Sequence, residues 1–388
     1  MNIRALPNTA EAIRLLSELA TRRSEISPRP VDRPLVLYGA GKLGHLAADL
    51  FRRLGIPVAY ALDRSPTAGG RLPGDIPIRR LDAVRQADRD SHMVAVCIVN
   101  APYKPIRADL SAMGWRHIFP VYDLLETYTD YLPMGNGWFA GRLNGEDMSR
   151  TSAVLSGWSD DWSRAAHLQF MAWRLHREEW SFQNAPVRID DRYFIEPVRP
   201  VMNENEYFLD AGAYHGDIAD RWLNIMGGRF RAILAVEADR ENIVHLRAWV
   251  ASLPVEMSRR IQVQDCALAA ESGIRSFSHG MDLASRIVNQ ADGNVRTCRL
   301  DDLNFPVTYG KIHLEGGELD ALRGGLNILQ RQRPMLAVTV YHNQDGLWRT
   351  PTFLMDTLQD YRFLMRLHAW CGTGAVLYAI PKERCCAA

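Results

Sequence analysis

The sequence predicts an α/β protein with two mostly parallel sheets, one in each half of the chain. Two stretches each place a buried strand, a glycine turn and an amphipathic helix in succession: LVLYGAGKLGHLAADLFRRLG from residue 35 and EYFLDAGAYHGDIADRWL from residue 206. A third observation is the final pair of strand-like runs, YRFLMRLHAW and GAVLYAIP, which CGT separates and which predict an antiparallel hairpin. Strand, turn and helix units of this kind build Rossmann-like sheets.

The length of 388 residues indicates more than one domain. Between its opening unit and the final hairpin, the second half has further predicted strands in FRAILAVEAD, IQVQDCAL, GKIHLE and PMLAVTVYH. Changes of pattern along the chain divide it into four predicted parts. These are an N-terminal helix and linker at 1–30, a Rossmann-like domain at 31–128, a helical linker or cover at 129–200, and a second α/β domain at 201–388. The stretch VRIDDRYFIEPV, at 187–198, is expected to be extended and to lead into the second α/β domain.

The composition is that of an ordinary globular protein, with 47% hydrophobic and 23% charged residues. Because 46 basic residues balance 45 acidic ones, charge gives no reason to expect nucleic acid or an anionic membrane as a partner. The apolar runs are of strand length, too short for a helix that spans a membrane. The six cysteines show neither metal-ligand spacing nor a disulfide framework. We expect a soluble cytoplasmic protein. The Trp-rich segment SGWSDDWSRAAHLQFMAWRLHREEW is predicted to be core or a homo-oligomer contact, and a helical cover over the active site would give the same pattern.

The first glycine loop, GAGKLGH, matches the GxGxxG pattern with Gly39, Gly41 and Gly44. Asp63 follows about 20 residues later, where an acid could bind a ribose. Glycines let a phosphate approach the N-terminus of the following helix. They also let strand and helix pack closely, so the loop is either a nucleotide site or a packing feature only.

The second glycine loop, DAGAYHGD, differs because Asp210 precedes its glycines, Gly212 and Gly216, with Ala213 and Asp217 completing the loop. A carboxylate would repel a pyrophosphate but attract the ammonium and sulfonium groups of S-adenosylmethionine. The loop therefore predicts a ligand that is cationic in its reactive part.

Two further acids follow the next two predicted strands. Glu237, followed by Ala238, could accept hydrogen bonds from both ribose hydroxyls. Asp265, followed by Cys266 and Ala267, could accept one from an adenine amino group. Three acids at three successive strand ends form a much stronger pattern than any one of them, and we predict a site for S-adenosylmethionine.

With these motifs in place, the second half resembles the FkbM family of S-adenosylmethionine-dependent methyltransferases over about residues 205–381. The resemblance lies in FLDAGAYHGD, AVEADRENIVHL, CALAAESG, TCRLDDL and KIHLEGGELDALRGG, in this order. It implies a class I methyltransferase fold, with a mostly parallel sheet ending in an antiparallel hairpin, and methyl transfer to an oxygen of a sugar or natural product. The positions that match family motifs are Asp210, Gly212, Gly216, Glu237, Asp301, Glu315, Gly316 and Glu318.

The first half, over roughly residues 34–125, resembles the nucleotide-sugar-binding N-terminal domain of bacterial sugar acetyltransferases. The resemblance lies in ALDRSPTAGGRLPGDIPIRRLDAV, where an acid at a strand end precedes a glycine-punctuated turn and a short strand. It implies that a nucleotide-linked sugar could bind at the N-terminal domain.

The stretch KIHLEGGELDALRGG departs from the family at His313, where relatives commonly have Asp. His313 and His342 are expected to end neighbouring strands, so either could remove the proton of an acceptor hydroxyl while Glu315 orients the imidazole or binds substrate. His368 could border the same opening, and Glu318 is expected to be structural in the first turn of a helix. A divalent metal held by these side chains is an alternative, although no compact ligand spacing indicates one; the histidines could also be structural.

These observations predict an O-methyltransferase that uses S-adenosylmethionine, with a sugar, glycan or natural product as acceptor. One alternative is a non-catalytic protein that binds a cofactor or a sugar nucleotide, which the departure at His313 favours. Another is an NAD-dependent oxidoreductase that uses the first glycine loop.

Overall fold

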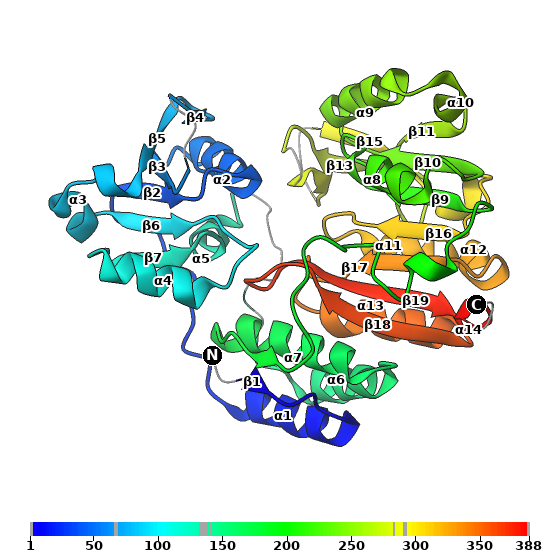
Figure 1. The fold of residues 1–388 in the computed structure, drawn as a ribbon, viewed down its shortest axis with the longest axis horizontal. Helices are drawn as coiled ribbons and strands as arrows, with labels where there is room; N and C mark the ends of the chain where they lie inside the picture. Colours follow the sequence, from blue (N-terminus) through cyan, green and yellow to red (C-terminus); the bar gives the residue numbers. More distant parts are fainter. Residues whose placement is uncertain are drawn as a thin grey trace.

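The computed structural model describes residues 3–65, 69–131, 139, 141–281, 284–289 and 293–385, and it confirms an α/β fold with mostly parallel sheets. Figure 1 shows a smaller sheet with its helices at the left and a larger sheet with its helices at the right. A group of helices from the N-terminal segment and the middle of the chain lies below them. Where the four predicted domains begin and end stays a prediction.

The smaller sheet has six strands in the order β4-β5-β3-β2-β6-β7, and all its pairs are parallel except β4 with β5. Strand β2 is buried along its whole length, as expected of a parallel strand covered on both faces. The strands are β2 (Leu35–Tyr38), β3 (Val58–Asp63), β4 (Arg71–Leu72), β5 (Ile76–Arg80), β6 (Met93–Val96) and β7 (His117–Pro120). The helices are α2 (Lys42–Arg53), η1 (Leu81–Ala83), α3 (Gln86–Ser91), α4 (Tyr103–Ala112), α5 (Val121–Leu125) and η2 (Glu126–Tyr128).

The larger sheet has seven strands in the order β11-β10-β9-β16-β17-β19-β18. The pairs among β11, β10, β9, β16 and β17 are parallel, whereas β19 runs antiparallel to β17 and β18, which confirms the predicted final hairpin. The chain leaves β9 toward β10 on one side and returns to β16 on the other, and open α/β sheets bind ligands at such a switch point. The strands are β9 (Tyr207–Ala211), β10 (Ala232–Glu237), β11 (Ile261–Asp265), β16 (Tyr309–Ile312), β17 (Met335–Thr339), β18 (Tyr361–Leu367) and β19 (Ala375–Pro381).

A four-stranded sheet, which the sequence analysis did not predict, follows β11 in the chain, in the order β12-β15-β13-β14. Its strands are short or half-exposed, so their apolar pattern is weak. They are β12 (Ala267–Leu268), β13 (Gly273–Ser278), β14 (Arg286–Ile287) and β15 (Gly293–Cys298). The helices of this half of the chain are α8 (Asp217–Met226), α9 (Arg240–Ser252), α10 (Val255–Ser258), η5 (Leu300–Asp302), α11 (Glu318–Arg323), α12 (Leu326–Arg331), α13 (Gly346–Thr357) and α14 (Lys382–Cys385).

The lower helices α1 (Thr9–Thr21), α6 (Gly145–Gly157) and α7 (Asp161–His176) share one apolar core with the edge strand β18 (Figure 1). Trp158 and Trp173 of the Trp-rich segment are buried inside the chain. Strand β1 (Ile3–Arg4) pairs with β8 (Ser181–Phe182), and η3 (Arg199–Val201) precedes β9. The stretch VRIDDRYFIEPV, expected to be extended, forms turns instead. Among the described residues, no helix has the length and apolar character needed to cross a membrane.

Several contacts join the smaller sheet to the rest of the molecule. The buried guanidinium of Arg177, just after α7, binds the carboxylate of Asp123 on α5, with Nη2 and Oδ1 2.8 Å apart. Lys42, at the start of α2, lies 3.0 Å from Asp217 Oδ2 at the start of α8. The helix after the first glycine loop therefore touches the helix after the second one.

Candidate functional site

The second glycine loop packs tightly between β9 and α8. The N–H groups of Gly212 and Ala213 both donate to the carbonyl of Val236 on β10, at 2.9 Å. Gly212 has a φ of +74°, and a Cβ there would lie 2.0 Å from the carbonyl oxygen of His313. Gly216 has a φ of +93°, and its Cβ would overlap the ring of Trp249. Both positions require glycine because of the backbone conformation and the neighbouring atoms.

Asp210 lies inside β9 rather than at an open strand tip, and its carboxylate is fully buried. Its register partner on β16 is Lys311, whose Nζ lies 2.8 Å from Asp210 Oδ1. The same ammonium donates to the carbonyls of Ala211 and Gly212, at 3.2 and 2.6 Å. Burial raises the pKa of Asp210, and the Lys311 charge opposes that rise. The pair therefore neutralises a charge under the glycine loop and fixes the loop's first carbonyls.

Glu237 ends β10 directly beside the glycine loop. Its Oε2 accepts the N–H of Tyr214 at 2.8 Å, and its Oε1 accepts those of Ala238 and Asp239 at 2.9 Å each. Burial raises the pKa of the Glu237 carboxyl, against the effect of these three donors. Every carboxylate oxygen offers two acceptor positions, so Oε2 retains one for a ligand hydroxyl.

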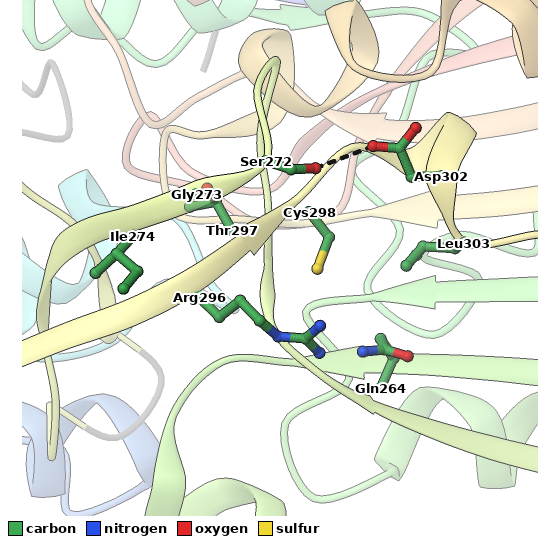
Figure 2. Close-up of a pocket in the computed structure, with 9 residues that line it drawn as sticks. All are labelled: Gln264, Ser272, Gly273, Ile274, Arg296, Thr297, Cys298, Asp302 and Leu303. Atoms are coloured by element: carbon green, nitrogen blue, oxygen red, sulfur yellow. Dashed lines mark hydrogen bonds between the residues drawn. The ribbon is translucent and has the colours of Figure 1, made fainter.

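Asp265 is the register partner of Glu237 on the neighbouring parallel strand, so both acids lie at the same edge of the sheet. The side chain of Asp265 is exposed, whereas Cys266 and Ala267 after it are buried. An open cavity of about 640 Å³ lies beside this strand, under β13 and β15 (Figure 2). Its wall includes Gln264 and Arg296 but neither predicted acid side chain. The cavity borders the predicted cofactor site, because Arg296 donates to the backbone carbonyl of Asp265 at 3.1 Å.

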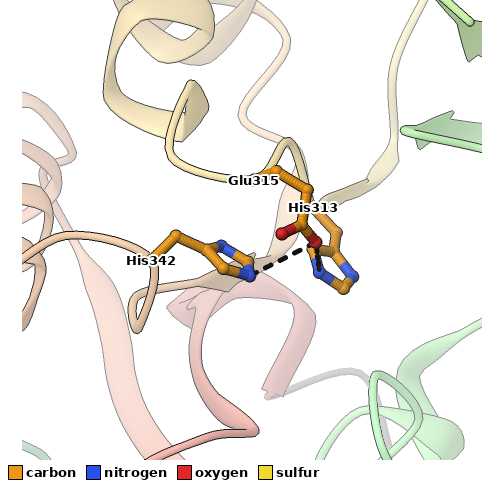
Figure 3. Close-up of side chains that lie close together, drawn as sticks. All are labelled: His313, Glu315 and His342. Carbon is orange, nitrogen blue, oxygen red and sulfur yellow. Dashed lines mark ion pairs between the residues drawn. The ribbon is translucent and has the colours of Figure 1, made fainter. Parts of the chain in front are cut away.

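The predicted catalytic residues His313, Glu315 and His342 come together at the ends of β16 and β17 (Figure 3). The Oε1 atom of Glu315 lies 2.9 Å from Nε2 of His313 and 3.4 Å from Nε2 of His342. The two imidazole rings stack with their centroids 5.0 Å apart. Glu315 holds a φ of +50°, which is uncommon for a residue other than glycine and marks a constrained turn.

Glu318 lies below this cluster and fixes His342. Its Oε1 faces Nδ1 of His342 at 2.8 Å and also accepts the hydroxyl of Thr339 and the N–H of Leu314. Burial opposes ionisation of Glu318, but His342 and these donors together lower its pKa to about 2. Burial lowers the pKa of His313 to about 4, although Glu315 acts in the opposite direction. Glu318 is therefore ionised and His313 neutral at pH 7.

Comparison with known proteins agrees with this architecture. Residues 210–365 match the family model of the methyltransferase FkbM domain. A solved structure of methyltransferase FkbM from Methylobacillus flagellatus KT shares the fold over 97% of this chain and 94% of that chain, with a TM-score of 0.59 and 17% sequence identity. Because the identity is low, this likeness shows the fold alone. With 97% of this chain covered, it extends to the smaller and the larger sheet.

Two further solved structures are similar over less of the chain. Precorrin-6y C5,15-methyltransferase from Geobacter metallireducens GS-15 aligns over 47% of this chain and 87% of that chain, with 16% identity and a TM-score of 0.30. The methyltransferase domain of bacterial CtHen1-CN aligns over 46% and 91%, with 13% identity and a TM-score of 0.29. Scores this low carry no argument about function. No protein of curated function matches the chain.

Two residues outside the matched FkbM domain contact His313, Tyr193 directly and Arg192 through the hydroxyl of Tyr341. Neither residue was predicted from the sequence. The hydroxyl of Tyr193 lies 2.8 Å from Nδ1 of His313. Arg192 donates to the hydroxyl of Tyr341 at 3.0 Å, and that hydroxyl lies 3.3 Å from Nε2 of His313. They lie in the turns between β8 and β9, and their spacing in the sequence gave no signal of this contact.

His368, predicted to border the same opening, has other partners. Its Nδ1 lies 2.6 Å from the carbonyl of Arg188 and 3.2 Å from Oδ1 of Asp191, and its Nε2 lies 2.8 Å from the hydroxyl of Tyr378. Both ring nitrogens are thus engaged away from Glu315. Asp301, which lies inside the matched FkbM domain, accepts the N–H of Ile328 and so caps the start of α12.

The first glycine loop has the geometry of a close strand-helix turn. Gly39 has a φ of +104°, and a Cβ on Gly44 would lie 2.1 Å from the carbonyl oxygen of Gly39, whereas Gly41 has open space. Asp63 accepts the N–H of Ala40 at 2.9 Å and thereby ties β3 to the loop. A cavity of about 260 Å³ lies beside these strand ends, with Asp63 in its wall.

Proposed function

We propose that the protein is an S-adenosylmethionine-dependent methyltransferase that methylates a hydroxyl group of a sugar, glycan or natural product. The observation that carries the proposal is the position of Glu237 and Asp265 at adjacent strand ends beside the glycine loop, inside the matched FkbM domain. The resemblance to the FkbM family supports the hydroxyl acceptor.

The residues at this edge of the sheet fit the nucleoside part of S-adenosylmethionine. Glu237 is anchored by three backbone donors and still has an acceptor position for a ribose hydroxyl. The exposed Asp265 carboxylate can accept the adenine amino group. Ala238, Cys266 and Ala267 follow these acids and supply small side chains beside the adenine. Gly212, Ala213, Gly216 and Asp217 form the loop that the methionine part would face.

We assign Asp210 a positioning role at this loop. Its charge is already paired with Lys311, so it adds little net attraction for a cationic ligand. The Lys311 ammonium fixes the carbonyls of Ala211 and Gly212, and thus the backbone that would border the methionine part. This differs from the direct attraction that the sequence pattern suggested.

The cofactor would supply an electrophilic methyl group on its sulfonium. An alcohol becomes a good nucleophile when its proton is removed, and we propose that the cluster of His313, Glu315 and His342 assists this step. His313 is neutral at pH 7 and so has an acceptor position for the proton. Burial makes it a weak base, and the Glu315 carboxylate, which raises the pKa of His313 against burial, would stabilise the imidazolium that forms while it orients both imidazoles. Glu318 holds His342 in place from behind.

Calorimetric titration with S-adenosylhomocysteine tests the cofactor assignment, with NAD and a UDP-sugar as comparators. We expect binding of the adenosyl ligand in the micromolar range and a loss of at least about tenfold in Glu237→Ala. Asp63→Ala, which changes the acid of the first loop, is the matched control and should bind like the wild type. Binding of NAD or the UDP-sugar alone, lost in Asp63→Ala, would contradict the proposal.

A non-catalytic cofactor-binding protein is the second candidate, because His313 stands where relatives of the FkbM family commonly have Asp. Such a protein would bind S-adenosylhomocysteine in the same way. Transfer of a labelled methyl group to a hydroxylated acceptor separates the two candidates, since only the enzyme would turn over.

A further inference from the structure

We propose that His313, Glu315 and His342 bind a divalent transition metal ion of the zinc class, which activates the acceptor hydroxyl. The three side chains offer Nε2, a carboxylate oxygen and Nε2, all within 4.8 Å of one another. Two imidazoles and one carboxylate form the ligand set of many catalytic zinc and non-haem iron sites. The inference rests on the proposed methyl transfer for its role, but not for the binding itself.

The two distances from the Glu315 carboxylate to the imidazoles are those of ligands around one ion. Ligands about 2.0–2.1 Å from a metal lie about 3.3 Å apart at tetrahedral angles. The two Nε2 atoms lie 2.9 and 3.4 Å from Oε1 of Glu315 (Figure 3). The side chain of His342 is 2% exposed, and those of His313 and Glu315 are 21% and 17% exposed. The ion would thus be reached from the side of His313 and Glu315.

The other nitrogen of each imidazole is held by a further side chain, as in metal sites whose histidines are oriented by outer partners. Nδ1 of His342 faces Oε1 of Glu318 at 2.8 Å, and Nδ1 of His313 faces the hydroxyl of Tyr193 at 2.8 Å. A carboxylate only accepts hydrogen bonds, so Nδ1 of His342 carries the proton. In the neutral ring its Nε2 lone pair then points at Glu315.

That arrangement leaves two acceptors, a ring nitrogen and a carboxylate oxygen, facing each other. A cation between them resolves the conflict, and a second proton on His342 would do so as well. Two guanidinium groups offset part of the negative charge of Glu315 and Glu318. Arg286 interacts electrostatically with both carboxylates, and Arg192 binds the hydroxyl of the neighbouring Tyr341. Binding measurements must therefore decide between the metal and an imidazolium.

The metal would act on the acceptor as a Lewis acid. An alcohol oxygen bound at an open coordination position loses its proton more readily, and the proton leaves to water. The oxygen then forms its bond to the methyl carbon while the bond from carbon to sulfur breaks, with its electron pair passing to the sulfur. Both histidines are then ligands of the ion, so the bound ion replaces His313 in the proton removal proposed above: it makes the hydroxyl more acidic, and water takes the proton. Nitrogen ligands favour zinc, cobalt or iron over magnesium and calcium.

Titration of untagged, chelator-treated protein with Co²⁺ tests the site, because the d–d absorption of the ion reports its coordination. We expect one ion per chain with the intense visible bands of a four- or five-coordinate site, displaced by Zn²⁺ and not by Mg²⁺. Glu315→Gln and His342→Ala should weaken binding by at least 100-fold, and Glu318→Gln by about 10- to 100-fold through loss of the outer partner.

His245→Ala is the matched control, since His215 and His245 form a second pair of neighbouring rings, with centroids 4.4 Å apart. It should leave the bands and the affinity unchanged. Thermal unfolding in the absence of metal identifies any variant that fails to fold, and Glu315→Gln, half-buried and isosteric, is the decisive one. Wild-type protein without these bands, or Co²⁺ affinity that Glu315→Gln leaves unchanged, would overturn the proposal. The assay needs no S-adenosylmethionine, so its failure is distinct from failure of the proposed function.

Discussion

The buried pair of Lys311 and Asp210 gives a sharp prediction about stability beneath the glycine loop. Lys311→Met leaves the Asp210 carboxylate buried without its partner, since the two side chains are 2% and 0% exposed. Removing one member of a buried pair costs about 3–5 kcal/mol, which is roughly 10²- to 5 × 10³-fold in the folding equilibrium. Asp210→Asn combined with Lys311→Met removes both charges and should recover at least about half of the loss.

Urea unfolding at pH 7, followed by tryptophan fluorescence and circular dichroism, measures this loss as a change in the free energy of unfolding of the part that contains the larger sheet. Lys42→Met is the matched control, because the ion pair of Lys42 with Asp217 is 76% and 55% exposed. Exposed pairs contribute about 0–1 kcal/mol, so this variant should unfold almost like the wild type. A loss below about 1 kcal/mol in Lys311→Met, or a double variant as unstable as the sum of the single ones, would refute the reasoning.

Three further predictions concern other parts of the chain. Burial lowers the pKa of His167 to about 3. It therefore stays neutral in the folded protein, whereas the unfolded chain takes up a proton there below about pH 6.5. The contribution of His167 to the free energy of unfolding is thus complete above about pH 6.5 and falls toward pH 3, by up to about 1.4 kcal/mol per pH unit. His167→Asn keeps an acceptor for the indole N–H of Trp158 and should flatten the pH dependence of the free energy of unfolding, measured from pH 7 to 4. Gly212→Ala places a Cβ 2.0 Å from the carbonyl oxygen of His313 and should lower the unfolding free energy by about 2 kcal/mol or more, whereas Gly55→Ala, also at positive φ but in open space, should cost about 1 kcal/mol in the same denaturation assay. Arg177→Met removes the buried ion pair with α5, and amide hydrogen exchange in α5 should become faster while that in β9 stays unchanged.

The arrangement of the larger sheet could be predicted because its strands are buried, apolar and separated by glycine turns. The final hairpin was predictable for the same reason, and β18 pairs with β19 over its whole length. The four-stranded sheet was missed because β12 and β14 have two residues each, which leaves no periodic pattern to detect. The extended form expected for 187–198 was wrong, because turn hydrogen bonds such as that from Phe194 N–H to the Asp191 carbonyl shape the segment.

The candidate site was predictable where parallel strands carry residues to one edge. His313 and His342 come together because β16 and β17 are adjacent and parallel. The contact of His313 with Tyr341, at the same place, joins residues that are 28 positions apart in the sequence. The contribution of Tyr193 was not predictable, because no periodicity relates a turn residue to a strand end in another part of the chain. The burial of Asp210 was also missed, since the Lys311 ammonium that balances its charge lies on another strand, distant in the sequence.

The most direct measurement of the central claim is a crystal structure of the protein with S-adenosylhomocysteine bound. We predict that the ribose hydroxyls lie within hydrogen-bond distance of Glu237, that the adenine lies beside Asp265, and that the sulfur points toward His313 and His342. Density for the ligand in the cavity beside Gly39, with the edge of the larger sheet empty, would contradict the account.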